Sequence, residues 1–292
     1  MSWLFGVVLA LPTVALSVLI VVVVAMCTGP WLTAMVAGVW LLVGIILVDV
    51  GWFTPNRQSW AAIFGFRKPV DAESEILAAA WANVTCAPGV DGWPYSLWVQ
   101  QSAYINATAV PTRIVAVTSG AVAALASRQL EAVLAHELGH HLLIDQRLRL
   151  LEAWCSVPAR FVQRLAAAAG RLVNALGIGA ILVRFVLVVI VLALLAVALA
   201  PVVGWPVALL LSALFAIEPL ASAARSRREE FAADRIAVDL GYGRDLAAAL
   251  RLWLRILPPP TGVVAVRARW FGSHPPIAAR LRRSERGYGG EQ

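Results

Sequence analysis

The residues of this sequence that are best suited to chemistry lie close together in the segment Glu131–His141. Within it, His136 and His140 are four positions apart, and Glu137 directly follows the first histidine. On a helix, residues at i and i+4 share a face, so both imidazole rings can reach one metal ion. This spacing is typical of a hydrolytic zinc site in which the glutamate acts as general base toward water.

The apolar residues around these histidines predict a helix that is buried on nearly all sides. Leucines, one valine and one isoleucine occupy most directions of the helical wheel from residue 130 to residue 144. Ionisable side chains are seldom buried without a partner or a metal, which favours a metal site over a histidine pair satisfied within the core. His141 points away from the shared face, and we interpret it as a surface or packing residue.

Zinc held by two histidines needs a third ligand, commonly a carboxylate, and an open position. The best candidate is the segment Arg227–Asp234, where Glu230 and Asp234 share a helix face at i, i+4. Glu230 could then bind the metal while Asp234 orients a ligand histidine. A solvent-exposed helix surface is the commoner meaning of such a Glu–Arg string, and Glu229 competes with Glu230 for the role.

The composition places the chain in a membrane. Of its 292 residues, 60% are apolar and 14% are charged, whereas soluble domains are about 45–50% apolar and about 25% charged. The net charge is +7, yet residues 1–56 contain no Lys or Arg and residues 172–224 contain one. Basic residues confined to the flanks of apolar spans indicate membrane topology and not a nucleic-acid partner. The three cysteines form no CxxC pair, which fits a reducing compartment.

Two apolar blocks predict two helical hairpins. The first is interpreted as a retained membrane anchor and not as a signal peptide, because it lacks a basic start and a cleavage site. In the second, the breaker-rich segment Pro201–Pro206 predicts a turn, and a shallow re-entrant pair is the alternative. An even number of crossings leaves His136 and Glu230 on the same side of the membrane. The expected legs are residues 3–27, 31–48, 178–199 and 205–222.

The remaining sequence predicts a mainly α-helical membrane protein with four transmembrane helices and a cytosolic α+β domain containing a small β-sheet. Expected water-soluble elements are a helix from Asp71 to residue 81, two or three strands within 94–118, and helices at 127–156, 225–240, 244–256 and 277–286. The expected organisation is an N-terminal transmembrane hairpin (1–56), a cytosolic part (57–171), a second hairpin (172–224) and a second cytosolic part (225–292).

The order of these motifs resembles a known family. His136–His141, followed after a membrane hairpin by Glu230–Asp234, resembles the HtpX-type membrane zinc metallopeptidases, which are relatives of the CAAX prenyl proteases. Asn106–Ala107 resembles the family's edge strand that lies along the substrate, although Thr108 stands where an aromatic residue is common. Ser273–Pro276 with Arg280 resembles its C-terminal His-Pro-Pro element. The resemblance covers residues 70–290.

The resemblance implies a role for each matching residue. It implies one Zn²⁺ per chain, an α+β zinc metalloprotease domain, and His274 and Arg280 near the site, where they could stabilise the oxyanion. Without the family, Ser273–Pro276 is only a helix start and Arg280 a solvated charge. The implied roles are zinc ligation by His136, His140 and Glu230, catalysis by Glu137, His274 and Arg280, orientation by Asp234, and substrate binding by Asn106 and Ala107.

These features predict a zinc metalloendopeptidase that hydrolyses membrane or membrane-adjacent polypeptides, as in protein quality control. The expected location is a bacterial inner membrane, multi-pass, with the catalytic domain and both termini cytoplasmic. The lipid bilayer and polypeptide substrates are the expected partners, with no nucleic acid. The alternatives are an intramembrane protease, a signalling protease that cleaves a regulator, and a non-catalytic scaffold that keeps a zinc site.

Overall fold

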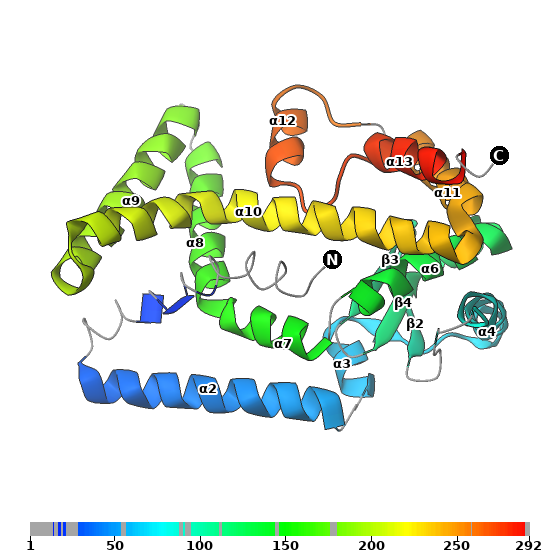
Figure 1. Ribbon diagram of the computed structural model, residues 1–292, viewed down its shortest axis with the longest axis horizontal. Helices are drawn as coiled ribbons and strands as arrows, with labels where there is room; N and C mark the ends of the chain where they lie inside the picture. Colours follow the sequence, from blue (N-terminus) through cyan, green and yellow to red (C-terminus); the bar gives the residue numbers. More distant parts are fainter. Residues whose placement is uncertain are drawn as a thin grey trace. The chain divides into compact units, whose positions relative to one another are not determined.

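The computed structural model describes residues 14, 17–18, 20–21, 29–53, 57–87, 90, 95–110, 113–143, 146–175, 180–257 and 259–289. The chain divides into two compact units (Figure 1). Unit 1 comprises Met1–Val48 and Leu150–Ser222, and unit 2 comprises Asp49–Arg149 and Ala223–Gln292.

Unit 1 is built from apolar helices. Helices α8, α9 and α10 meet through Ala159, Leu199 and Ala208, which are fully buried. Trp154 stacks on Trp40 and donates its indole N–H to the Trp40 carbonyl oxygen at 3.0 Å. The helices that contribute to this unit are α2 (Pro30–Phe53), α7 (Gln146–Cys155), α8 (Val157–Ala175), α9 (Ala180–Val203) and the first part of α10 (Trp205–Ala237).

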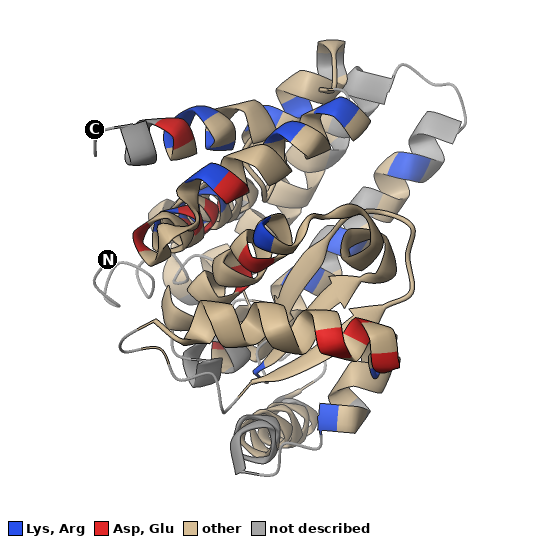
Figure 2. Cartoon of the chain, turned by 90° about the vertical axis from the view of Figure 1, so that its right-hand side faces the viewer, with Lys and Arg blue, Asp and Glu red and all other residues tan. Residues whose placement is uncertain are grey.

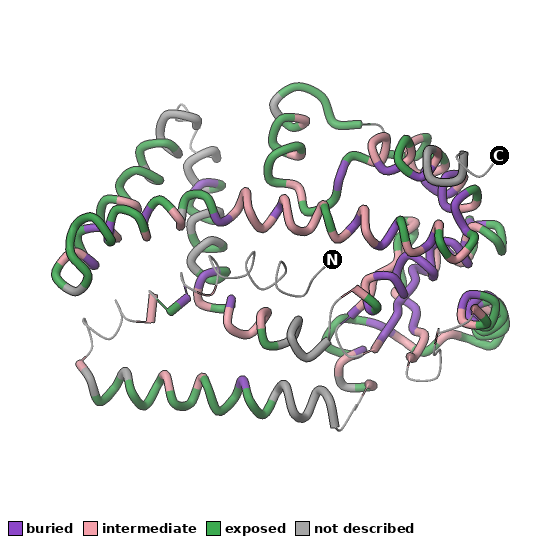
Figure 3. Tube along the Cα trace, in the orientation of Figure 1, coloured by how far each residue is buried: buried purple, intermediate pink, exposed green. Residues whose placement is uncertain are grey.

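The predicted spans are confirmed only in part. The turn expected within Pro201–Pro206 is present at Gly204, whose φ of +79° separates α9 from α10. Of the described residues, one helical run, Trp205–Ile256, is long and apolar enough to cross a membrane. Much of α2 and α9 is exposed along its length (Figure 3), but their described apolar stretches are shorter. Residues 3–27 fall almost entirely outside the described residues, so four spans remain a prediction.

A small mixed sheet lies in unit 2. Its order is β1-β2-β4-β3, with β2 parallel to β4 and the two outer strands antiparallel to their neighbours. Two or three strands are expected within 94–118, and the structure has three there, whereas the two residues of β1 are too few to show a sequence pattern. The strands are β1 (Phe66–Arg67), β2 (Ser96–Gln100), β3 (Ala107–Val110) and β4 (Ile114–Thr118).

Helix α6 (Ser127–Leu143) is the central helix of unit 2. Every residue from Leu130 to Gly139 is buried, as the helical wheel predicted. It packs against the sheet and against α4 (Asp71–Thr85) and α11 (Gly243–Ile256). The first turn of α4 contains Asp71 and Glu73, where the helix dipole favours negative charge; Figure 2 colours the acidic residues of the chain red. The core around α6 thus fixes the helix that carries both histidines.

One predicted helix boundary is wrong and another stays a prediction. The helix expected over 127–156 is described as α6 and α7, and residues 144 and 145 between them lie outside the described residues, so an unbroken helix there stays a prediction. The boundary expected between the leg 205–222 and the helix 225–240 is wrong: the leg and most of that helix form one helix, α10, which has no glycine and continues through Pro219. Gly241, with φ +88°, has a non-helical backbone and kinks the chain at the predicted end of the helix expected over 225–240. Unit 2 also contains α3 (Arg57–Ile63), α5 (Ser119–Ala124), η1 (Val238–Tyr242), α12 (Gly262–Phe271) and α13 (Ile277–Gly289).

Candidate metal centre

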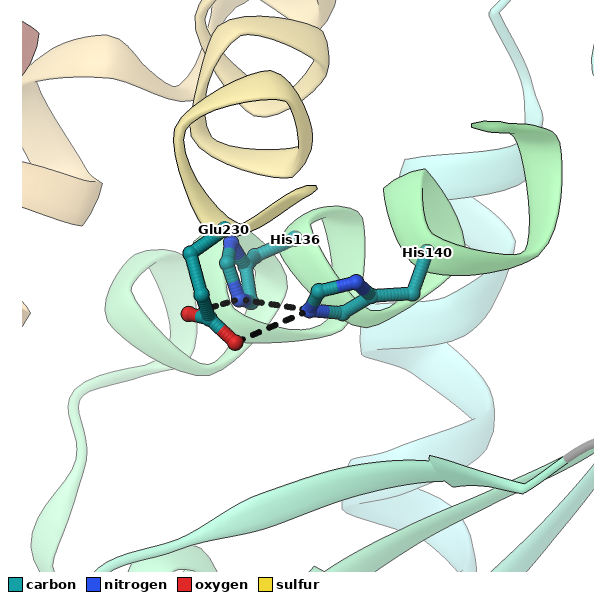
Figure 4. A group of neighbouring side chains, drawn as sticks. All are labelled: His136, His140 and Glu230. Atoms are coloured by element: carbon teal, nitrogen blue, oxygen red, sulfur yellow. Dashed lines mark hydrogen bonds and ion pairs between the residues drawn. The ribbon is translucent and has the colours of Figure 1, made fainter. Parts of the chain in front are cut away.

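Helices α6 and α10 bring the predicted ligands together. The Nε2 atoms of His136 and His140 lie 3.2 Å apart. Each lies 3.5 Å from a carboxylate oxygen of Glu230, and the three side chains converge on one point (Figure 4). Gly139 permits this approach, because a Cβ there would lie only 3.0 Å from the Cα of Ala233 on α10.

The three ligand atoms fit a zinc ion. Bonds of about 2.0–2.2 Å at tetrahedral angles place ligand atoms about 3.3–3.6 Å apart. The two Nε2 atoms are 3.2 Å apart and each is 3.5 Å from a different oxygen of Glu230, so the side chains lie close to that spacing. Two imidazole nitrogens and one carboxylate oxygen are also the donor set of catalytic zinc sites that keep an open position. The group therefore suits zinc in both its chemistry and its spacing.

Asp234 lies behind the first histidine. Its Oδ1 is 2.9 Å from Nδ1 of His136, so a proton on Nδ1 leaves the Nε2 lone pair directed at the ligand cluster. Arg280 from α13 contacts both carboxylates at once. Its Nη1 lies 3.0 Å from Oε2 of Glu230, and its other nitrogens donate to the two oxygens of Asp234 at 2.7 and 2.9 Å. Arg280 is buried. Its interpretation as a solvated charge is therefore wrong.

His274 joins the cluster from the loop before α13. Its Nδ1 is 2.9 Å from Oε1 of Glu230, while its side chain is 73% exposed. Arg227 holds this loop by donating to the carbonyl oxygens of Trp270 and Gly272 at 3.3 and 3.0 Å. Arg227 lies one helical turn before Glu230, so a single helix supplies the carboxylate and anchors the loop beside it.

The charges around the cluster shift its pKa values. Burial and the Arg280 charge act to lower the pKa of His136, but hydrogen bonds to Asp234 and Glu230 outweigh them and raise it to about 9. The hydrogen bond to Glu230 raises the pKa of His274. Burial acts to raise the pKa values of Glu230 and Asp234, yet their contacts with His136 and the other cationic partners hold both pKa values below the usual range. Glu230 and Asp234 are therefore ionised at neutral pH and favour a cation.

A comparison with models of protein families shows which family the chain belongs to. The model of peptidase family M48 matches residues 73–286, a range that contains both helices of the cluster. The chain belongs to peptidase family M48. M48 peptidases are zinc-dependent metallopeptidases, so the resemblance read from the sequence is confirmed. None of the curated proteins compared matches the chain.

A solved structure also resembles this M48 chain. The crystal structure of S. mikatae Ste24p is 17% identical, with a TM-score of 0.47. The match covers 96% of this chain and 65% of that chain, so the present sequence spans less than two thirds of the length of that protein.

The cluster of this M48 chain opens into a cavity of about 660 Å³. Glu137 is buried and lines the cavity beside the two histidines. Glu229 lines it as well, but it is Glu230 that reaches the histidine nitrogens. His141 lies outside the cavity lining and packs edge-on against the ring of Tyr95, as expected for a packing residue.

Asn106 and Ala107 line the same cavity at the start of β3, the edge strand. Thr118, at the end of β4, holds this segment: its hydroxyl accepts from the Asn106 amide at 2.9 Å and donates to the Tyr104 carbonyl oxygen at 2.6 Å. Trp253 donates its indole N–H to the Ile105 carbonyl oxygen at 2.8 Å. Neither support was predicted, although the strand-to-helix step at Thr118 is a recognisable N-cap signal.

Proposed function

We propose that this chain is a membrane-bound zinc endopeptidase that holds one Zn²⁺ through His136, His140 and Glu230. The observation that carries this proposal is the convergence of three side chains from two helices of an M48 chain: the Nε2 atoms of His136 and His140 lie 3.2 Å apart, and each lies 3.5 Å from one of the two carboxylate oxygens of Glu230. When bound, zinc supplies Lewis-acid chemistry that makes water more acidic and a peptide carbonyl more electrophilic.

The side chains of the cavity then have separate tasks. Glu137 is the general base: it takes a proton from the attacking water and passes that proton to the leaving amine. Asp234 keeps His136 in the tautomer that presents Nε2 to the metal. Arg280 is a positioning residue, because its donors are committed to two carboxylates. His274 reaches Glu230 but is largely exposed, which supports a role as donor to the developing oxyanion.

The free edge of β3 suits an extended polypeptide. In an antiparallel pair, successive residues alternate between bonding to the neighbouring strand and turning their main-chain groups away from it. The Thr118 amide donates to the Asn106 carbonyl oxygen at 2.9 Å, so Ala107 and Ala109 turn their N–H and C=O groups toward the free edge. A substrate strand can pair there through its main chain, and side-chain selectivity is then loose.

Membrane or membrane-adjacent proteins are the proposed substrates, in a quality-control role. Glu230 follows residue 222, the predicted end of the apolar leg, by about 12 Å along α10. The positive-inside pattern supports a bacterial inner membrane protein whose catalytic part and termini are cytoplasmic. The four-part division at residues 56, 171 and 224 belongs to this proposal, with each cytosolic part supplying one side of the metal site.

The decisive experiment measures metal content and proteolysis on the same purified full chain. We expect about one zinc per chain, casein cleavage that a chelator abolishes, and restoration by added zinc. Glu137→Gln should retain zinc and lose cleavage, while Glu229→Gln, its control in the same cavity, should keep both. Wild-type-like cleavage by Glu137→Gln would remove Glu137 from the role of base. Zinc without any cleavage by the wild-type chain would instead support the scaffold alternative.

A further inference from the structure

Helix α8 carries a stripe of arginines that the peptidase site does not use. Arg160, Arg164 and Arg171 are all exposed, and the helix contains no acidic residue. At 100° per residue these three positions fall within about 40° of one another on the helical wheel. They extend over eleven residues, or about 17 Å of the helix axis. The positive charge thus follows the helix lengthwise and is not gathered at one end.

An exposed apolar stripe adjoins the arginines. Val157, Phe161 and Leu165 are 43%, 60% and 54% exposed and follow one another at i, i+4. The opposite side of the helix faces protein, since Ala159 is fully buried against Leu199 and Ala208. Helix α8 therefore has three sides, of which one packs on unit 1, one is apolar and exposed, and one is basic.

We propose that α8 lies along the surface of an anionic bilayer, with Phe161 and Leu165 among the acyl chains and the three arginines on phosphate headgroups. The membrane placement of the chain belongs to the proposed function, on which this inference rests. An amphipathic helix with bulky apolar residues beside a basic face is the type that binds at the interface of anionic membranes. Charge complementarity identifies the occupant as acidic phospholipid.

Other placements of α8 conflict with its charges. If the helix crossed the bilayer, Arg164 would lie about 10 Å from its start and Arg171 about 21 Å, so one of them would sit deep in hydrocarbon. If a second copy covered the same face, stripes of like charge would approach one another without an acidic partner on α8. Only the in-plane position lets all three guanidinium groups reach headgroups while the apolar stripe leaves water.

The test uses the full chain in lipid nanodiscs and reads the position of α8 directly. In a background without Cys27, Cys86 and Cys155, an environment-sensitive fluorophore is attached through Phe161→Cys, with Glu75→Cys as the exposed control site. Nanodiscs contain phosphatidylcholine alone or a mixture with phosphatidylglycerol, and nitroxide lipids report the depth of the label. We expect a blue shift at position 161, dependent on phosphatidylglycerol, with strongest quenching by nitroxides near the headgroups, and no shift at position 75.

Each arginine near an anionic surface contributes about fivefold to binding. The triple variant Arg160→Gln, Arg164→Gln, Arg171→Gln should therefore shift the equilibrium of the label from lipid toward water about a hundredfold. The matched control removes three exposed arginines elsewhere, Arg244, Arg255 and Arg269, and should leave the label in lipid.

Three outcomes would overturn the proposal. The first is label emission that is the same with and without phosphatidylglycerol and in the triple arginine variant. The second is strongest quenching by nitroxides in the middle of the acyl chains. The third is shielding of the label from water in lipid-free detergent, to an extent that increases with protein concentration. The last two indicate a spanning helix and a second copy, respectively. Casein cleavage is measured on the same samples. Its absence in the wild-type chain would count against the peptidase proposal alone, since the fluorescence does not depend on catalysis.

Discussion

Replacing Arg280 by glutamine tests whether this residue positions the metal ligands or contacts the reacting peptide. Its guanidinium lies 3.0 Å from Glu230 and donates to Asp234 at 2.7 and 2.9 Å. All three groups are buried. Arg280→Gln leaves two carboxylates without their cation, and removing one partner of a buried ion pair costs about 3–5 kcal/mol. The free energy of unfolding of the metal-free protein should fall by that order.

The effect on function should appear in zinc affinity. Loss of a residue that holds a ligand and its hydrogen-bond partner lowers metal affinity by about 10–100-fold. Once zinc is saturating, the ligands are held by the metal itself, and kcat should fall by less than about tenfold. An oxyanion donor behaves differently, because its loss lowers kcat by about 10²–10³-fold. The two roles therefore separate in one variant.

The assay pairs a competition titration against a zinc-binding dye with casein cleavage over a range of free zinc. Arg282→Gln removes an exposed arginine from the same helix and should change neither quantity. Unchanged zinc affinity in Arg280→Gln, together with a hundredfold loss of kcat at saturating zinc, would refute the positioning role. Arg280 would then be assigned to the oxyanion.

Three further changes probe other parts of the site. Gly139→Ala forces α6 and α10 apart, since the added Cβ would lie 3.0 Å from the Cα of Ala233. The free energy of unfolding should fall by about 1–3 kcal/mol, and zinc should bind more weakly. An unchanged temperature of thermal unfolding would contradict this prediction. Ala109→Pro removes an N–H that points away from β4, which β3 does not need for its own pairing but which a substrate strand would bind. KM for peptides should therefore rise more than kcat falls. A fall in kcat with unchanged KM would argue against substrate pairing along β3. Below its pKa of about 9, His136 holds a proton that zinc must displace. The apparent zinc affinity should therefore fall about tenfold for each unit by which the pH is lowered from 9 to 7. A zinc affinity that does not change with pH would exclude this competition.

The sequence could predict α6 because everything needed is local. The i, i+4 spacing of His136 and His140 and the apolar wheel around them lie within four helical turns. The third ligand could not be fixed in the same way. Glu229 and Glu230 differ by one position on a helix remote in sequence, and only the packing of α10 on α6 at Gly139 and Ala233 decides which carboxylate faces the histidines.

The missed features depend on tertiary contacts or on competing local signals. The predicted membrane leg ends at residue 222 and the predicted soluble helix begins at residue 225, yet α10 continues without a break from one to the other. The hydrogen bonds from Arg227 to the loop before α13 join residues more than forty positions apart, so no local pattern marks them. Trp253 supports the edge strand in the same way, from a distant helix.

The charges of the site explain why its parts belong together. Glu137, Glu230 and Asp234 are three buried carboxylates and Arg280 is one buried guanidinium, so these four groups carry a formal net charge of −2 when the histidines are neutral. Buried charge needs compensation, and a divalent cation supplies it in full. Without that cation, hydrogen bonds to Asp234 and Glu230 raise the pKa of His136 to about 9, so a proton supplies part of the missing charge. The carboxylates that attract zinc therefore also favour binding of a proton, which competes with zinc for His136. Because Arg280 neutralises only one of the three negative charges, the site retains the two that a divalent cation would neutralise.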